Sequence, residues 1–380
     1  MRVLMQSRVS LYTVPGGDTV QITQTKAALE AKGIHVDLSL ELEPDLSSYD
    51  LVHLFNFTRI QETYIQALNA KRQNKPVVLS TIYWPFDEFE HQGQRGWRAA
   101  FNRCLSVNEI EYLKGIWRFL RDGERNQATR ALLARGYRGL QHATLPMIDF
   151  FLPNSEIEMQ AYCKDFGLEL EATRYQVVVN GVDLRFGAPP TVEADEIPEG
   201  GILCVARIET RKNQLALLRA AKGLGVPLVF VGGCAPNHAA YLQELRAEAD
   251  DSVIFAGRVE HDRLPAVYRR ARVHALVSWF ETPGLSSLEA GIAGCNLVVS
   301  DRGSTREYFG DHAQYCDPNS VSSIRSALEQ ALVTPPSSRL AERIRRDYSW
   351  DSAAMQTLTA YQRVTGQPVL TPSFSQLDQT

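Results

Sequence analysis

The stretch from Trp279 to Gly291 decides the fold and reads W-F-E-T-P-G-L-S-S-L-E-A-G. It follows the apolar run Val273 to Ser278, which is typical of a buried parallel strand. The leucine and isoleucine spacing after its glycine predicts a helix that ends near Gly294. We therefore expect a glycine turn at the carboxyl end of a strand, where open α/β sheets bind ligands.

Backbone amides and two carboxylates give this turn its chemistry. The segment Gly284–Leu285–Ser286 begins the helix, and the first amides of a helix favour an anion such as phosphate. Glu281 and Glu289 flank the same turn, and carboxylates accept strong hydrogen bonds from hydroxyl groups. The pattern fits a ligand that carries phosphates and hydroxyls, although either glutamate alone is more simply interpreted as a helix cap or a solvated side chain.

Composition limits the class of protein. The chain has 380 residues, of which 44% are hydrophobic, which is enough for a core in each of two domains. A net charge of -4 gives no support to nucleic-acid binding. No apolar run approaches a membrane span and the N-terminus lacks a signal-peptide core, so we expect a cytoplasmic protein. The six cysteines show no C-x-x-C pair and are expected as reduced core thiols; no metal site is predicted.

The first half of the chain alternates strands and helices, which predicts a doubly wound parallel sheet. The expected strands are 1–5, 34–38, 50–55, 76–80, 150–153 and 176–179, and the expected helices are 20–32, 59–72 and 155–166. Gly16 and Gly17 follow the first strand, where they either bring backbone amides close to a phosphate or form a plain turn.

The segment 93–140 interrupts this alternation and reads as helices with ten Arg and Lys residues. Trp97, Phe101, Trp117, Phe119 and Tyr137 are interleaved with them. A basic and aromatic face favours peripheral contact with an anionic membrane or a pyrophosphate-bearing acceptor. A helical cover with inward aromatics and solvated arginines is an equally good interpretation.

The second half predicts another doubly wound domain, with strands at 202–206, 227–231, 253–256, 273–278 and 297–300. Prolines and acids within 184–200 indicate a linker. We therefore expect one domain over 1–185 with the closing helix 351–366, a second over 186–350, and a flexible tail at 367–380. Arg207 and Lys212 follow the first strand of the second domain, where they either converge on a diphosphate or are two solvated cations.

These motifs resemble the retaining glycosyltransferases of family 4, which have the GT-B fold of two Rossmann-like domains facing across a cleft. The most specific match is E-x7-E, from Glu281 to Glu289. The Arg207 and Lys212 pair and the Gly16-Gly17 loop also match. Three further segments are similar to family motifs: N-G-V-D at 180–183, D-R-G-S-T-R-E at 301–307 and Y-S-W-D at 348–351.

The resemblance implies a role for each site residue. Arg207 and Lys212 would neutralise the diphosphate of a nucleotide-sugar donor, without a metal or a cofactor. Glu289 would hold the ribose and Glu281 the transferred sugar. The amides of Gly284, Leu285 and Ser286 would complete the phosphate site, with Gly16 and Gly17 approaching from the other domain. The loop ending at Val259 would bind the base, and the closing helix would return to the first domain.

One departure from the family pattern concerns the first domain. Many members carry a histidine after the fourth strand, whereas this chain reads S-T-I-Y-W-P from Ser80 to Pro85. His53 and His91 are the candidates to replace it. A structural role is the simpler interpretation of His53, because it lies in an apolar strand.

The leading functional hypothesis is sugar transfer, with retention, from a nucleotide-diphosphate sugar to a glycan or lipid-linked acceptor in surface polysaccharide or lipopolysaccharide assembly. A GT-B phosphorylase or sugar-nucleotide epimerase is the second hypothesis. A non-catalytic scaffold subunit of a glycan-assembly complex is the third.

Overall fold

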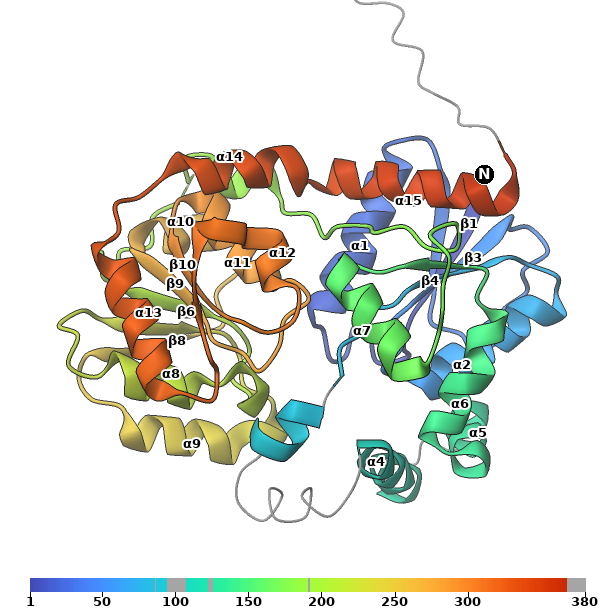
Figure 1. Ribbon diagram of the computed structural model, residues 1–380, viewed down its shortest axis with the longest axis horizontal. Coiled ribbons are helices and arrows are strands. Elements are labelled where there is room, and N and C mark those ends of the chain that lie inside the picture. The colour runs from blue at the N-terminus through green and yellow to red at the C-terminus, as the bar shows by residue number, and fades with distance from the viewer. Residues whose placement is uncertain (86, 94–106, 122–125, 191, 368–380) are drawn as a thin grey trace, which may run out of the picture.

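Two α/β halves lie side by side in the computed structural model (Figure 1), which describes residues 1–85, 87–93, 107–121, 126–190 and 192–367. Each half is built on one sheet whose paired strands are all parallel. We call the elements from β1 to α7, together with α15, the first lobe, and the elements from β6 to α14 the second lobe. The predicted class of two doubly wound sheets is confirmed.

The first lobe has the strand order β2-β1-β3-β4-β5. Alternate side chains of β1 point to opposite faces, so Val3 and Met5 lie in one apolar cluster and Leu4 in the other. Helices cover both faces and shield these clusters from water. The elements are β1 (Arg2–Gln6), α1 (Gly17–Glu30), β2 (His35–Ser39), β3 (Leu51–Phe55), α2 (Ile60–Arg72), β4 (Val77–Ser80), β5 (Phe150–Leu152) and α7 (Glu156–Phe166).

The second lobe has the strand order β11-β10-β9-β6-β7-β8. Most of its strands are largely apolar because helices bury both faces of the sheet. The strands are β6 (Ile202–Val205), β7 (Leu228–Val231), β8 (Val253–Gly257), β9 (Val273–Leu276), β10 (Asn296–Ser300) and β11 (Ala313–Cys316). The helices are α8 (Gln214–Ala221), α9 (Ala239–Glu248), α10 (Leu264–Arg270), α11 (Leu285–Ala293), α12 (Thr305–Phe309), α13 (Val321–Val333) and α14 (Ser338–Asp347).

The last helix, α15 (Trp350–Thr365), leaves the second lobe and lies along the first (Figure 1). Lys32, just after α1, forms an ion pair with Asp351 at the start of α15. Farther along, the Tyr361 hydroxyl and His53 Nδ1 are 2.7 Å apart in the core of the first lobe. The chain thus crosses between the lobes twice. The two crossing segments are hydrogen-bonded to each other, because the amide of Val182 donates to the carbonyl of Tyr348 at 2.9 Å.

The described parts of the segment 93–140 are helical, as the sequence predicts. They form α4 (Val107–Arg121), α5 (Gln127–Arg135) and α6 (Tyr137–Thr144), preceded by the π-helix η1 (Phe89–Gly93). Tyr137 packs inward while Trp117 is 57% exposed, so these two aromatics do not share one face. Trp97 and Phe101 lie outside the described residues, as does the tail 368–380.

Two predictions of secondary structure are wrong. The expected strand 176–179 is an extended segment beside β5, with a lone bridge at Tyr175 and hydrogen bonds from the amides of Gln176 and Val178. β11 was not expected, because its sequence A-Q-Y-C mixes polar and apolar residues at a half-exposed edge of the sheet.

The five described cysteines are free thiols: Cys204, Cys295 and Cys316 are buried, whereas Cys163 and Cys234 are only half-buried. Cys104 lies outside the described residues. Among the helices that the structure describes, none has the length and apolar character needed to span a bilayer.

Replacing Tyr361 with Phe tests how α15 is anchored. The change removes the hydroxyl from His53 Nδ1, and the other ring nitrogen, Nε2, stays 2.9 Å from Ser80 Oγ. One buried ring nitrogen is left without a partner, so the free energy of unfolding should fall by about 1–3 kcal/mol. Urea unfolding followed by circular dichroism measures it. Met355→Ala, on the exposed side of α15, is the matched control, and equal losses in both variants would contradict the anchor.

Candidate functional site

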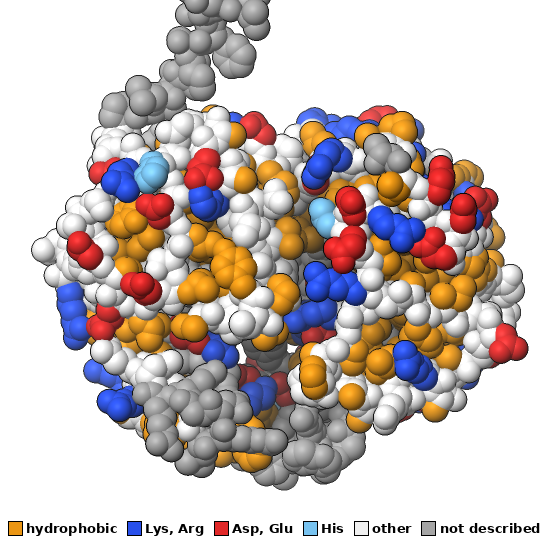
Figure 2. All heavy atoms as spheres, turned by 180° about the vertical axis from the view of Figure 1, so that it is seen from behind, with side chains coloured by type: hydrophobic (Ala, Val, Ile, Leu, Met, Phe, Trp, Pro, Cys, Tyr) orange, Lys and Arg blue, Asp and Glu red, His pale blue; other side chains and the backbone are white. Residues whose placement is uncertain are grey.

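A cleft of about 710 Å³ lies between the two lobes at the carboxyl ends of their strands. Its described lining includes five cationic side chains but only two carboxylates, so it carries an excess of positive charge. The space-filling view shows Lys and Arg side chains gathered in the hollow where the halves meet (Figure 2). The charged lining residues are Arg8, Asp18, Arg59, Arg207, Arg211, Lys212 and Glu281.

A buried ion pair forms the floor of the cleft on the side of the second lobe. Lys212 Nζ lies 2.5 Å from Glu281 Oε1, and both side chains are largely shielded from water. Lys212 ends the short helix η4 (Thr210–Lys212) after β6, and Glu281 follows β9. The loops after these neighbouring strands therefore bring together two residues that lie 69 positions apart.

Burial and charge act against each other in this pair. Burial works to raise the pKa of Glu281, but the Lys212 ammonium and the nearby Arg211 hold it below its usual value. Burial also lowers the pKa of Lys212, against the opposing pull of Glu281. The carboxylate is thus stabilised in its charged form, which makes it a strong hydrogen-bond acceptor for a hydroxyl group.

Arg207 reaches across the cleft toward the glycine loop of the first lobe. Its side chain is 44% exposed, and its guanidinium lies 3.4 Å from the Glu209 carboxylate. A Cβ built on Gly16 would lie 4.0 Å from guanidinium nitrogens of both Arg207 and Arg8. Gly16 and Gly17 line the cleft together with Arg207, so the structure brings these three predicted residues together.

The N-terminus of α11 opens into the same cleft. Gly284 precedes the helix with φ +89°, a left-handed conformation that favours glycine, and Gly284, Leu285 and Ser286 all line the cleft. Within the part of the chain that the structure describes, no protein acceptor takes the amides of Leu285 and Ser286. Unpartnered amides at a helix N-terminus suit an anion.

Glu289 and Val259 lie outside the lining of the cleft. Glu289 sits one turn further along α11, where its Oε2 accepts a hydrogen bond of 2.8 Å from the Tyr268 hydroxyl. Burial raises the pKa of Glu289 to about 7. Val259 follows β8 and packs, half-buried, against the apolar cluster that contains Leu288. The two residues predicted to bind ribose and base are therefore set back from the charged lining.

The cleft has an apolar wall where family members carry a histidine. Ile82, at φ +43°, and Trp84 follow β4 and line the cleft. His53 is buried in the first sheet between Tyr361 and Ser80, and burial lowers its pKa to about 3. His91 Nδ1 bonds Asp87 O at 2.7 Å and does not line the cleft. Neither histidine takes the expected place.

Sequence reasoning missed the polar residues that the first lobe contributes. Arg8 Nε lies 2.6 Å from Asp18, and the same guanidinium donates to Val14 O and Ser10 O, so it braces the loop that carries Gly16. Asn56 Nδ2 donates to Asp18 at 3.4 Å. The available signal was position, because Arg8 lies two residues after β1 and Asn56 directly follows β3, both at the carboxyl ends of the strands.

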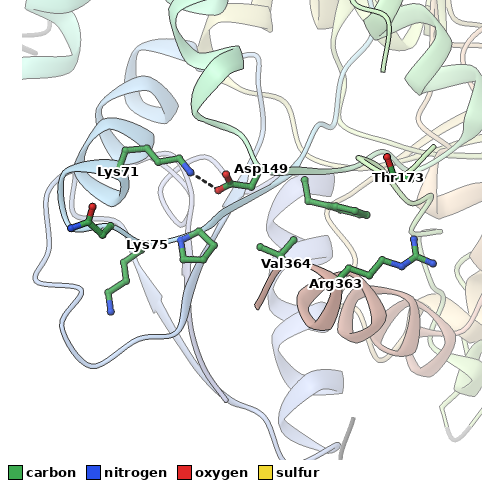
Figure 3. Close-up of a pocket in the computed structure, with 9 residues that line it drawn as sticks. Lys71, Lys75, Asp149, Thr173, Arg363 and Val364 are labelled. Atoms are coloured by element: carbon green, nitrogen blue, oxygen red, sulfur yellow. Dashed lines mark hydrogen bonds and ion pairs between the residues drawn. The ribbon is translucent and has the colours of Figure 1, made fainter. Parts of the chain in front are cut away.

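A second hollow, of about 510 Å³, lies at the amino-terminal ends of β4 and β5, away from the cleft. Lys71 is paired with Asp149 there, while Lys75 and Arg363 point away from each other (Figure 3). Its cations do not converge on one point, which distinguishes it from the cleft. Within the described ranges, no group of three or more His, Cys, Asp or Glu side chains could hold a metal ion.

Comparisons with known proteins agree with this architecture. Residues 197–347 match the family described as glycosyl transferases group 1. O-antigen chain mannosyltransferase B of Escherichia coli is 30% identical over 175 residues, which cover 43% of this chain and 46% of that protein. The match thus spans about half the length of that relative.

Two longer matches cover most of the chain. The N-acetylgalactosamine-N,N'-diacetylbacillosaminyl-diphospho-undecaprenol 4-alpha-N-acetylgalactosaminyltransferase of Campylobacter jejuni is 27% identical over 320 residues, covering 80% of this chain and 83% of that protein. The structure of sucrose-phosphate synthase from Thermosynechococcus elongatus has a TM-score of 0.69 at 15% identity, covering 96% of this chain and 99% of that chain. At this identity the structural likeness shows the fold alone.

Two parallel-sheet lobes that face across a cationic cleft define the GT-B fold, which confirms the predicted architecture. Within that class, residues 197–347 of the second lobe are similar to the group 1 glycosyl transferases. The resemblance predicted from the E-x7-E motif is confirmed at this level.

The raised pKa of Glu289 predicts a pH-dependent affinity for nucleoside diphosphates. If its carboxylate accepts hydrogen bonds from ribose hydroxyls, protonation below pH 7 removes that acceptor. UDP or GDP should therefore bind up to about tenfold more weakly at pH 6 than at pH 8, measured by calorimetry. The variant Glu289→Gln controls for ionisation of the nucleotide phosphates, and its affinity should differ less between pH 6 and pH 8. The same pH dependence in both proteins would contradict the role.

Proposed function

We propose that this chain is a retaining glycosyltransferase of family 4 that transfers a sugar from a nucleoside-diphosphate sugar without a divalent metal. The observation that carries the proposal is the convergence of Arg207, Lys212 and the N-terminus of α11 on one cleft, opposite Gly16 and Gly17. Positive charge and free amides at one place suit a diphosphate.

Lys212 and Arg207 stabilise the negative charge that develops on the departing diphosphate. This charge is larger in the transition state than in the bound donor, so groups already fixed in place lower the barrier. Lys212 is fixed by its pairing with Glu281, which removes the need to reorganise a long side chain during the reaction. The amides of Leu285 and Ser286 act on the same phosphates.

Glu281 holds the hydroxyls of the transferred sugar. Its lowered pKa keeps it a carboxylate, and it lines the cleft beside the phosphate site, where it can accept hydrogen bonds from sugar hydroxyls. The C1–O bond to the diphosphate breaks while the acceptor oxygen bonds to C1 on the same face of the sugar. The acceptor proton goes to the departing phosphate oxygen. This route relies on positioning rather than on a protein base, in keeping with the apolar wall formed by Ile82 and Trp84.

The acceptor is a glycan or lipid-linked saccharide in surface polysaccharide assembly, and the protein works in the cytoplasm with peripheral contact to an anionic membrane. Support for this acceptor class comes from the similarity to the O-antigen chain mannosyltransferase of Escherichia coli and the diphospho-undecaprenol-linked glycan transferase of Campylobacter jejuni. We also propose that the lobes are two domains, 1–185 with 351–366 and 186–350, and that the second binds the donor.

Turnover of defined donors tests the reaction. In buffer with EDTA, the wild type should hydrolyse or transfer sugar from at least one of UDP-glucose, UDP-N-acetylgalactosamine and GDP-mannose, with retention seen by NMR. Lys212→Ala and Glu281→Gln should each lower kcat by about a hundredfold or more, because each removes stabilisation of the transition state.

Lys222→Ala is the matched control, since Lys222 is an exposed lysine of the same lobe, and it should leave kcat unchanged. Near-normal turnover in Lys212→Ala would overturn the role of that residue. Loss of activity with EDTA, or an inverted product, would contradict metal independence or retention respectively.

A further inference from the structure

The segment after β10, from Asp301 to Tyr308, supports the backbone of Glu281. Gly303 has φ +71°, and a Cβ at this position would lie 2.0 Å from Glu281 O, so only glycine allows the contact. The amide of Ser304 donates to the same carbonyl at 2.9 Å. The position of Glu281 in the cleft therefore depends on the position of this segment.

The same segment is tied to the first lobe through Glu307. Its carboxylate accepts the amides of Glu156 at 3.0 Å and Ile157 at 3.1 Å, which begin α7. Helix N-termini leave such amides without partners and favour negative charge, so the contact suits both sides. Ser304 Oγ lies 2.6 Å from Ser155 Oγ, and both serines are fully buried.

Arg302 makes a second contact between the lobes from the same segment. Its Nε lies 3.0 and 2.8 Å from the two carboxylate oxygens of Glu88. Glu88 belongs to the stretch after β4 that also carries Trp84, a residue of the apolar wall. Arg302 is held on its other side by Asp317 at 3.3 Å in the second lobe.

Because residues 302–307 contact both the first lobe and the backbone of Glu281, a shift between the lobes is transmitted to Glu281. We propose that Glu307 and Arg302 are positioning residues, which set Glu281 against the first lobe for sugar transfer. This inference rests on the proposed function of Glu281. It assigns a role to the D-R-G-S-T-R-E segment that goes beyond joining the two lobes.

Amide hydrogen exchange tests the coupling without any donor. In Glu307→Ala, the amides of Glu156 and Ile157 lose their acceptor and should exchange faster. If the segment positions Glu281, a peptide spanning 279–287 should also exchange roughly threefold faster or more, although Glu307 does not bond to it. Glu329→Ala, a solvent-exposed carboxylate of the same lobe, should change neither. Faster exchange confined to 156 and 157 would overturn the proposal.

Arg302→Ala and Glu88→Gln give the same test at the second contact. The side chains of Arg302 and Glu88 are 29% and 35% exposed and form a partly exposed ion pair, so both variants should keep the fold. They provide the test if Glu307→Ala does not fold. Each variant should lower kcat for UDP-glucose or GDP-mannose about five- to tenfold with little change in KM. The double variant should lower kcat no further than either single variant. Multiplied losses would contradict a shared role.

These outcomes separate the two proposals. A wild type that turns over none of the donors contradicts the proposed function, while hydrogen exchange at 279–287 still decides whether Glu307 and Arg302 position Glu281. An active wild type with unchanged kcat in both Arg302→Ala and Glu88→Gln contradicts the positioning role alone.

Discussion

The buried ion pair between Lys212 and Glu281 is the interaction around which the cleft is arranged. A single buried charge costs several kcal/mol, and removing either partner leaves the other uncompensated. The pair is tolerated here because two loops at the ends of neighbouring parallel strands fix both partners. They hold Lys212 Nζ 2.5 Å from Glu281 Oε1. The same geometry places the carboxylate and its cation in the lining of the cleft together with the N-terminus of α11. Structural stability and the proposed chemistry therefore depend on one contact.

The two-lobe architecture explains why the cleft needs support from outside itself. Its charged groups come from both lobes, so their spacing is set by whatever holds the lobes together. α15 anchors the second lobe to the core of the first through Tyr361, and Glu307 and Arg302 add contacts close to the cleft. Each of these contacts joins residues far apart in the chain, which makes the cleft a product of tertiary structure rather than of any single motif.

Local patterns in the sequence predicted most of the fold. The apolar run before Trp279 and the glycine at position 284 fix β9 and the start of α11, because burial and backbone conformation act over a few residues. β11 escaped prediction because its half-exposed edge position mixes polar and apolar residues.

The candidate site could be predicted only in part. Arg207, Lys212 and Glu281 were found from their positions after strands and from the family pattern, and they do share the cleft. The bracing role of Arg8, the wall formed by Ile82 and the contact of Glu307 with α7 could not be read from the sequence. Those depend on partners up to 151 positions away or on a backbone conformation rarely adopted by a β-branched residue.

Binding of nucleoside diphosphates tests the central claim, a diphosphate site built on Lys212, most directly. Thermal unfolding is followed in metal-free buffer with UDP, GDP, ADP, dTDP or CDP, for the wild type, Lys212→Ala and the control Lys222→Ala. A ligand at about a hundred times its Kd adds roughly 2.7 kcal/mol to the free energy of unfolding. We predict that one nucleotide raises the melting temperature of the wild type and of Lys222→Ala but not of Lys212→Ala. Equal stabilisation of all three proteins, or of none by any nucleotide, would contradict the account.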